Sequence, residues 1–208
     1  MPRTAALPNT PGAETPPAAS ASVRDRILDT ATELFYQEGV RAVGVDLVVD
    51  RSGVAKTSLY RHFSTKDELV VAFLERENSD YWGHWDNIAH RPQASAAAEL
   101  KAHLQRIADY IAGPKYRGCP FLNVATEFPA PDHPARAVAA GHKAELRRRL
   151  TGLTRQMGAG QPEALADQLV ILIDGAYVNG HLLGNKGPAG SLVPAALALI
   201  SAAGLQAG

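Results

Sequence analysis

Apolar residues recur at helical spacing from the first quarter of the chain onwards. Ser22 and Asp25 form the Ser-x-x-Asp pattern that is typical of a helix start, because the serine oxygen can accept from free backbone N–H groups. The apolar positions that follow have a helical period and predict one buried stripe: Val23, Ile27, Ala31, Leu34 and Phe35. Gly39 ends this helix, since glycine readily adopts positive φ.

Two short helices follow, separated by a tight turn. The first covers about 45–51, with Val45, Val48 and Val49 facing inward, and the second covers Lys56–His62. The second helix buries Leu59 and Phe63, and the turn between the helices contains Gly53. Two short helices joined by a glycine-containing turn of three or four residues predict a helix-turn-helix.

The rest of the chain is predicted to be helical. A long helix begins at Ser64 to Glu68, with a hydroxyl cap and acids in its first turn, and runs to about His90 before Pro92. Alanine- and leucine-rich segments between glycine and proline breakers then predict helices over 95–112, 119–128, 133–157, 162–183 and 191–203. The pattern contains no strand, so the predicted fold class is all-α: an N-terminal three-helix helix-turn-helix domain (22–66) and a larger helical domain (67–208).

Composition adds expectations about the environment. Residues 1–21 contain five prolines and no hydrophobic stretch, so they are expected to form a disordered tail rather than an export signal. No apolar run reaches the roughly 18 to 20 residues needed to cross a bilayer. Cys119 is the only cysteine, which excludes an internal disulfide and fits a reducing cytosol. We therefore expect a cytoplasmic protein without membrane contact.

Charge gives a mixed indication of nucleic-acid binding. The formal net charge is zero, which argues mildly against it. Between residues 51 and 66, however, four cations occur with His62 and no acid: Arg51, Lys56, Arg61 and Lys66. Such a patch can contact several phosphates, although on charge alone a solvated face explains it equally well.

A longer pattern favours DNA binding. The run Gly53-Val54-Ala55-Lys56-Thr57-Ser58-Leu59-Tyr60-Arg61-His62-Phe63, followed by Ser64-Thr65-Lys66-Asp67-Glu68-Leu69, closely resembles the N-terminal module of the tetracycline-repressor (TetR) family of bacterial regulators. The resemblance implies that the Lys56–His62 helix enters the major groove, which admits one α-helix. The DNA-binding residues it implies divide into possible base readers (Lys56, Thr57, Ser58 and Arg61) and phosphate clamps (Tyr60, His62 and Lys66).

Two positions depart from the usual family pattern. Val43-Gly44 stands where members commonly carry threonine or serine at the start of the second helix, and Ala55 stands where many carry a capping serine. One phosphate contact and one cap of about 1 kcal/mol are therefore expected to be absent.

By the same resemblance, the larger domain forms an inducer pocket and a dimer interface. The candidate ligand-binding residues are aromatic or polar side chains: Tyr81, Trp82, Trp85, His103, Ile107, Tyr110, Phe121, Asn123, Glu127, Tyr177 and His181. Aromatic residues at helical spacing are also typical of a core, so this alternative stays open for the tryptophans. No cofactor is expected, and His84, Asp86 and His90 lie on different helix faces, so no metal site is expected.

The last two helices are expected to form the homodimer interface. One predicted stripe comprises Leu165, Leu169, Leu172, Ile173, Ala176 and Val178, and the other comprises Leu192, Ala195, Ala196, Leu199, Ile200 and Ala203. Two such helices from each subunit would make a four-helix bundle. Burial within one subunit is the alternative.

These observations predict a ligand-responsive transcriptional regulator and favour a repressor. We expect it to bind a palindromic operator as a dimer and to be released by a small, mainly apolar inducer. The chain contains none of the common catalytic or phosphate-binding motifs, so we do not expect an enzyme. The alternative is a helical small-molecule carrier or interaction module without DNA binding. Activation instead of repression also stays open.

Overall fold

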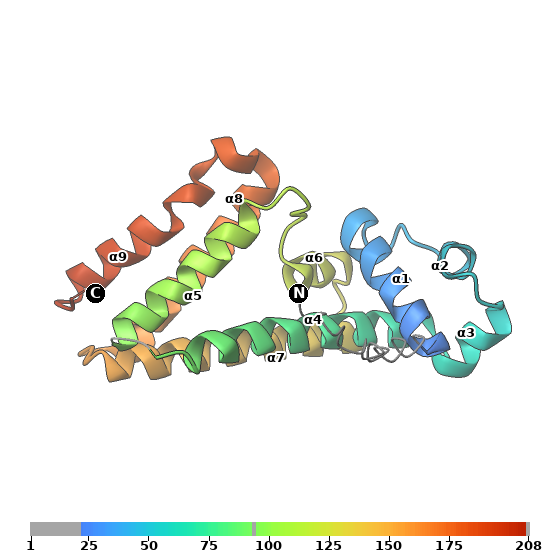
Figure 1. The fold of residues 1–208 in the computed structure, drawn as a ribbon, viewed down its shortest axis with the longest axis horizontal. Coiled ribbons are helices and arrows are strands. Elements are labelled where there is room, and N and C mark those ends of the chain that lie inside the picture. Colours follow the sequence, from blue (N-terminus) through green and yellow to red (C-terminus); the bar gives the residue numbers. More distant parts are fainter. Residues whose placement is uncertain (1–21, 93–94, 207–208) are drawn as a thin grey trace, which may run out of the picture.

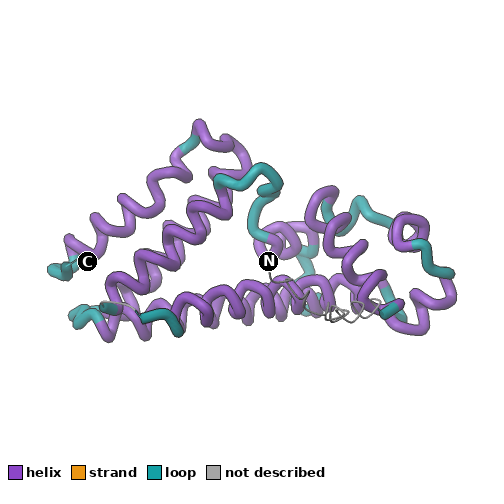
Figure 2. The backbone as a smooth tube through the Cα atoms, viewed as in Figure 1, coloured by secondary structure: helices purple, strands orange, loops and turns teal. Residues whose placement is uncertain are grey.

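The computed structural model describes residues 22–92 and 95–206. Over these residues the chain forms nine α-helices, two short 3₁₀ segments and no strand (Figures 1 and 2). The helices are α1 (Val23–Glu38), α2 (Val45–Ser52), α3 (Lys56–His62), α4 (Lys66–Ala89), α5 (Ala96–Ile111), α6 (Pro120–Glu127), α7 (Pro134–Gln156), α8 (Pro162–Leu183) and α9 (Leu192–Ala202). The predicted all-α fold is confirmed, whereas the predicted tail, 1–21, lies outside the described residues.

The helix ends form where the capping chemistry predicts them. Ser22 and Thr65 each accept a hydrogen bond from the backbone N–H three residues on, at 3.1 Å, and so cap α1 and α4. Gly39 ends α1 with φ +91°, and Gly53 ends α2 in the left-handed region with φ +64°. By contrast, Gly44 and Ala55 precede α2 and α3 without any side-chain cap, as the departures from the family pattern predict.

Helices α1 to α3 pack into a small domain around buried side chains that include Ile27, Val48 and Leu59. Phe35 of α1 meets Phe73 of α4 edge to face, with ring centroids 5.8 Å apart. This contact belongs to one continuous core that extends from the small domain into the larger one. The long α4 therefore joins the two, and it runs beside α7 along the base of the molecule (Figure 1).

Helices α8 and α9 correct one expectation. Leu165, Leu169, Ile173 and Ala176 are buried within the chain, as are Leu192, Ala196 and Ile200 of α9. They are buried because α8 and α9 pack against each other and against α5, so these side chains cannot face a second subunit. The other residues of the predicted stripes are less buried: Leu172, Ala195 and Leu199 are half-buried, Val178 is 47% exposed and Ala203 is exposed. Val178 lies among the exposed apolar residues of α8, with Ile171, Leu182 and Leu183.

Candidate functional site

Helix α3 presents a polar surface on two buried anchors. Leu59 and Phe63 are 0% and 3% exposed and fix the helix on the small core. The predicted DNA-binding side chains lie on its free side, where Lys56, Thr57, Tyr60, Arg61 and His62 are exposed and Ser58 is half-buried. A helix held in this way can enter a groove without unfolding the domain that carries it.

The lysines at the two ends of this surface differ in their surroundings. Lys56 forms an ion pair with Asp46 of α2, with Nζ and Oδ1 2.6 Å apart. Both side chains are largely exposed, so the pair contributes little and phosphate can compete with it. Lys66 is half-buried at the start of α4, and burial lowers the pKa of its amine.

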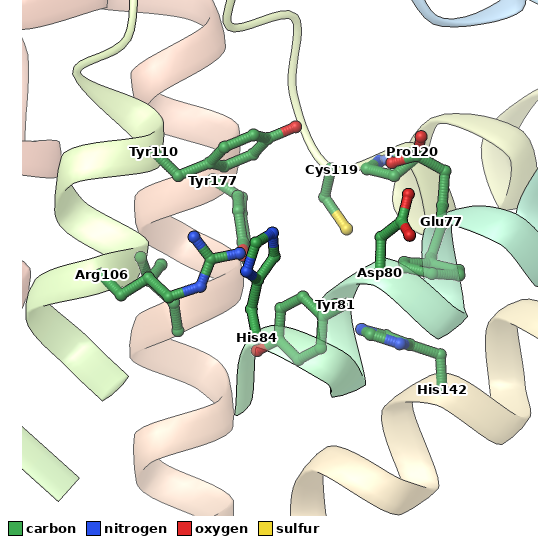
Figure 3. A pocket seen from close by; sticks show the side chains of 12 residues that line it. Glu77, Asp80, Tyr81, His84, Arg106, Tyr110, Cys119, Pro120, His142 and Tyr177 are labelled. Carbon is green, nitrogen blue, oxygen red and sulfur yellow. The ribbon is translucent and has the colours of Figure 1, made fainter. Parts of the chain in front are cut away.

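The larger domain contains a cavity of about 230 Å³ between α4, α5, α7 and α8 (Figure 3). Five of the predicted ligand-binding residues line it: Tyr81, Ile107, Tyr110, Phe121 and Tyr177. The rest of the lining is largely polar and was not predicted: Glu77, Asp80, His84, Arg106, Cys119, Pro120 and His142. Four of these, Glu77, Asp80, His84 and Arg106, could have been found from helical spacing, because the first three lie beside Tyr81 on one flank of α4 and Arg106 precedes Tyr110 by one turn.

The remaining six predicted ligand residues lie outside the cavity. Trp85 is buried and stacks on His103 with ring centroids 3.6 Å apart, and Trp82 packs on Trp85 and beneath Arg149. Trp85 thus belongs to the core, Trp82 is half-buried and packs against it, and His103 belongs to the same cluster. Neither tryptophan lines the cavity. Asn123, Glu127 and His181 instead line a second cleft, which lies against α1 and the loop after it.

That second cleft connects the two domains through hydrogen bonds. The Glu127 carboxylate accepts from the backbone N–H groups of Val40 and Arg41, at 3.1 and 2.6 Å. The hydroxyl of Tyr36 on α1 lies 2.8 Å from that of Tyr110, a residue that also lines the ligand cavity. The cavity wall is thus bonded directly to the domain that carries α3.

Burial changes the acid–base properties of the cavity. It raises the pKa of Glu77 to about 6, with a further contribution from the charge of Asp80. It also raises the pKa of the Cys119 thiol, which keeps this 4% exposed side chain protonated and unreactive. The described residues contain no group of three His, Cys, Asp or Glu side chains that could hold a metal ion.

Two buried histidines predict a loss of stability in acid. Burial lowers the pKa of His103 to about 4 and that of His142 to about 3. Their folded pKa values lie below the unfolded value of 6.5, so the unfolded chain binds protons first. Their contribution is complete above about pH 6.5 and is lost as the pH falls towards 4, by about 3 kcal/mol per histidine at most.

Urea unfolding of the wild type and His103→Phe at pH 7 and pH 4.5 measures this loss. We expect the free energy of unfolding of the variant to depend on pH less steeply, by about 2 kcal/mol over this interval. His90→Gln, at an exposed position, is the control and should retain the wild-type slope. Equal slopes for His103→Phe and the wild type would show that folding does not lower the pKa of His103.

Comparisons with known proteins cover both domains. Residues 27–73 match the family described as bacterial regulatory proteins, tetR family, and residues 96–195 match the tetracyclin repressor-like C-terminal domain. A TetR-family transcriptional regulator from Streptomyces coelicolor superposes with a TM-score of 0.79 and 32% identity, over 87% of this chain and 93% of that one. A TetR-type regulator from Streptomyces avermitilis gives a TM-score of 0.78 and 30% identity, over 89% of this chain and all of that one.

Among curated proteins the likeness is shorter. The HTH-type transcriptional activator FasR of Mycolicibacterium smegmatis is 36% identical over 94 residues, which are 42% of this chain and 40% of that protein. The HTH-type transcriptional repressor ComR of Escherichia coli is 33% identical over 89 residues, 43% of this chain and 39% of that one. The matched segment therefore spans about two fifths of these relatives, whose names include both directions of control.

Proposed function

Because this chain belongs to the TetR family of transcriptional regulators, we propose that it is a repressor that binds a palindromic operator as a homodimer. In this proposal the protein releases the operator when a small molecule occupies the cavity described above. The family regulates transcription and is not enzymatic, in agreement with the absence of catalytic motifs from the sequence. No helix among the described residues is both long and apolar enough to cross a membrane.

The observation that carries the DNA-binding part is the free surface of α3. Seven residues that can donate to bases or phosphates lie on α3 or at the start of α4: Lys56, Thr57, Ser58, Tyr60, Arg61, His62 and Lys66. Arg61 and Lys56 can donate to guanine in the major groove, whereas Tyr60 and Lys66 suit the phosphate backbone. A carrier of small molecules has no need of such a surface.

The dimer is supported by one exposed apolar face of α8. Ile171, Gly175, Val178 and Leu182 follow one another at spacings of four, three and four residues, so they share a face of the helix. Ile171 and Leu182 are each 71% exposed, and Gly175 leaves room for a partner helix to approach. A two-fold operator requires a two-fold protein, so we assign this face to the interface of the homodimer.

In the proposed release mechanism, α4 connects the ligand cavity to α3. Glu77, Tyr81 and His84 of α4 line the cavity, and three residues separate the start of this helix from the end of α3. A ligand that prefers one tilt of α4 would change the separation of the two α3 helices in the dimer. Since half-sites lie about one helical turn apart or a multiple of it, a small change in this separation weakens operator binding.

The test is a selection from random duplex DNA with the full chain. The proposal requires recovery of a palindromic sequence that the wild type binds and Arg61→Ala binds more weakly. Recovery of no sequence would favour the alternative, a ligand carrier without DNA binding. Placing the recovered operator before or over a reporter promoter then distinguishes repression from activation.

A further inference from the structure

The cavity contains a histidine whose proton position is fixed by its neighbours. His142 of α7 is 3% exposed, and its Nδ1 lies 2.9 Å from Oδ1 of Asn78. The same oxygen lies 2.8 Å from Nε1 of Trp82. Because an indole N–H can only donate, the amide of Asn78 must present its oxygen to Trp82.

This orientation determines which nitrogen of His142 carries the proton. An amide oxygen only accepts, so Nδ1 of His142 must donate to it. Burial lowers the pKa of His142 to about 3, so the ring is neutral at pH 7 and has one proton. Nε2 is therefore left with a free lone pair, and no described residue donates a hydrogen bond to it.

The ring occupies a position from which Nε2 can serve a ligand. His142 lines the cavity and stacks on Phe121 with ring centroids 3.7 Å apart, which fixes its plane. Figure 3 shows the ring reaching from α7 towards the interior of the cavity, with Asp80 and Glu77 above it on the same side of the view. A ligand that displaces solvent from this acceptor without offering a donor leaves it unsatisfied at a cost, and a ligand with a donor avoids that cost.

Among the other polar groups of the cavity, Arg106 can only donate, and Figure 3 shows it across the cavity from His142. The groups on the side of His142 discriminate less or favour the same kind of ligand as His142. The hydroxyls of Tyr81 and Tyr177 rotate and can either donate or accept. Glu77 and Asp80 are acceptors when ionised, as His142 is at Nε2. The polar groups on this side of the cavity therefore favour a donor.

The size of the cavity limits the ligand. Its volume of about 230 Å³ exceeds the roughly 150 Å³ of an engineered cavity that takes benzene. It is smaller than the pockets of about 300 to 1,000 Å³ that hold drug-sized molecules. One or two rings fit this space, between aromatic walls that include Phe121 and Tyr177.

We propose that Nε2 of His142, fixed as an acceptor by Asn78 and Trp82, selects a ligand of one or two rings that carries an N–H or O–H donor. This inference rests on the proposed ligand site but not on DNA binding. It refines the expectation of a mainly apolar inducer: the body is apolar, and one donor group is required.

Two matched probes test the selection. Indole and benzofuran have nearly the same shape, but only indole has a donor. We expect indole to bind the full chain at least about fivefold more tightly than benzofuran, which leaves the acceptor unsatisfied. Ligand-observed NMR measures both affinities.

A variant of His142 tests whether this residue causes the difference. His142→Phe keeps an aromatic ring beside Phe121 and should reduce the ratio of the two affinities to within about twofold. His90→Phe makes the same change at an exposed position outside the cavity and should leave the ratio high.

A second measurement needs neither a ligand nor a stable His142 variant. Long-range ¹H–¹⁵N correlation spectra of the wild type show which ring nitrogen carries the proton, and we expect Nδ1. Trp82→Phe removes the donor that orients Asn78, so a second tautomer should appear in this variant. A proton on Nε2 in the wild type, equal affinities for the two probes, or binding of neither probe would each overturn the proposal. None of these outcomes depends on operator binding, so failure here is distinct from failure of the DNA-binding function.

Discussion

Ile171→Glu combined with Leu182→Glu is expected to convert the protein to a monomer and to reduce operator affinity at least about 100-fold. Both side chains are 71% exposed in the single chain, so the substitutions should leave its core intact. In the dimer each carboxylate would be buried without a partner, at a cost of about 3–5 kcal/mol each. A monomer contacts only one half-site of the operator, so its affinity for the operator falls.

Sedimentation velocity and anisotropy with labelled operator measure the two effects. Ala137→Glu with Ala140→Glu adds the same charge on an exposed part of α7 and should change neither association nor operator affinity. Leu169→Glu is a useful contrast, because Leu169 is 0% exposed and its replacement should unfold the chain instead of separating subunits. A monomeric wild type at micromolar concentration would contradict the assigned interface.

Operator binding is expected to weaken steeply with salt. If each subunit makes about four phosphate contacts, the dimer makes about eight, and the slope of log K against log salt is near −7. Such a slope corresponds to a loss of about 10⁴-fold between 50 and 200 mM salt. Lys66→Ala should weaken binding to all sequences and reduce the slope by about one or two, counting both subunits.

Alanine variants of three lysines distinguish contacts to phosphates from contacts to bases. Lys56→Ala should relax the preference at one operator position, because Lys56 lies at the start of α3 where side chains reach base edges. Lys101→Ala, on α5 in the larger domain, is the control and should leave the slope unchanged. A flat salt response, or a Lys66→Ala slope equal to that of the wild type, would argue against this interface.

Sequence periodicity predicted the helices closely, because their ends are marked by local chemistry. Thr65, Gly39 and Pro162 act within one turn of their own positions, so the bounds of α1, α4 and α8 follow from neighbouring residues. Of the predicted α8 stripe, Leu165, Leu169, Ile173 and Ala176 are buried, in agreement with the alternative of burial within one subunit. What the period does not specify is which surface covers the stripe, and Leu169 is covered by its own chain.

The α4 helix gives a second case in which the hydrophobic pattern does not specify what surrounds a side chain. Tyr81 lies at the boundary between two flanks of α4. One flank carries Trp82 and Trp85, on which the sequence-based prediction relied. Trp85 is buried in the core, and Trp82 is half-buried and packs on it. The other carries Glu77 and His84, and it faces the cavity. Hydrophobicity alone favours the wrong flank, because a binding site needs polar groups that a core excludes.

The bonds between the domains also set the scale of regulation. Glu127 accepts two N–H groups, and Tyr36 meets Tyr110 through one hydroxyl contact. A neutral hydrogen bond contributes about 0.5–1.5 kcal/mol and a charge-assisted one about 1.5–3. A 100-fold change in operator affinity requires about 2.7 kcal/mol of coupling. If these contacts transmit the change, breaking one or two of them suffices for a 100-fold response, and other bonds between the domains, such as that from Arg117 Nε to the backbone oxygen of Gln37, can stay in place. Operator release therefore needs a partial rearrangement of this contact and not separation of the two domains.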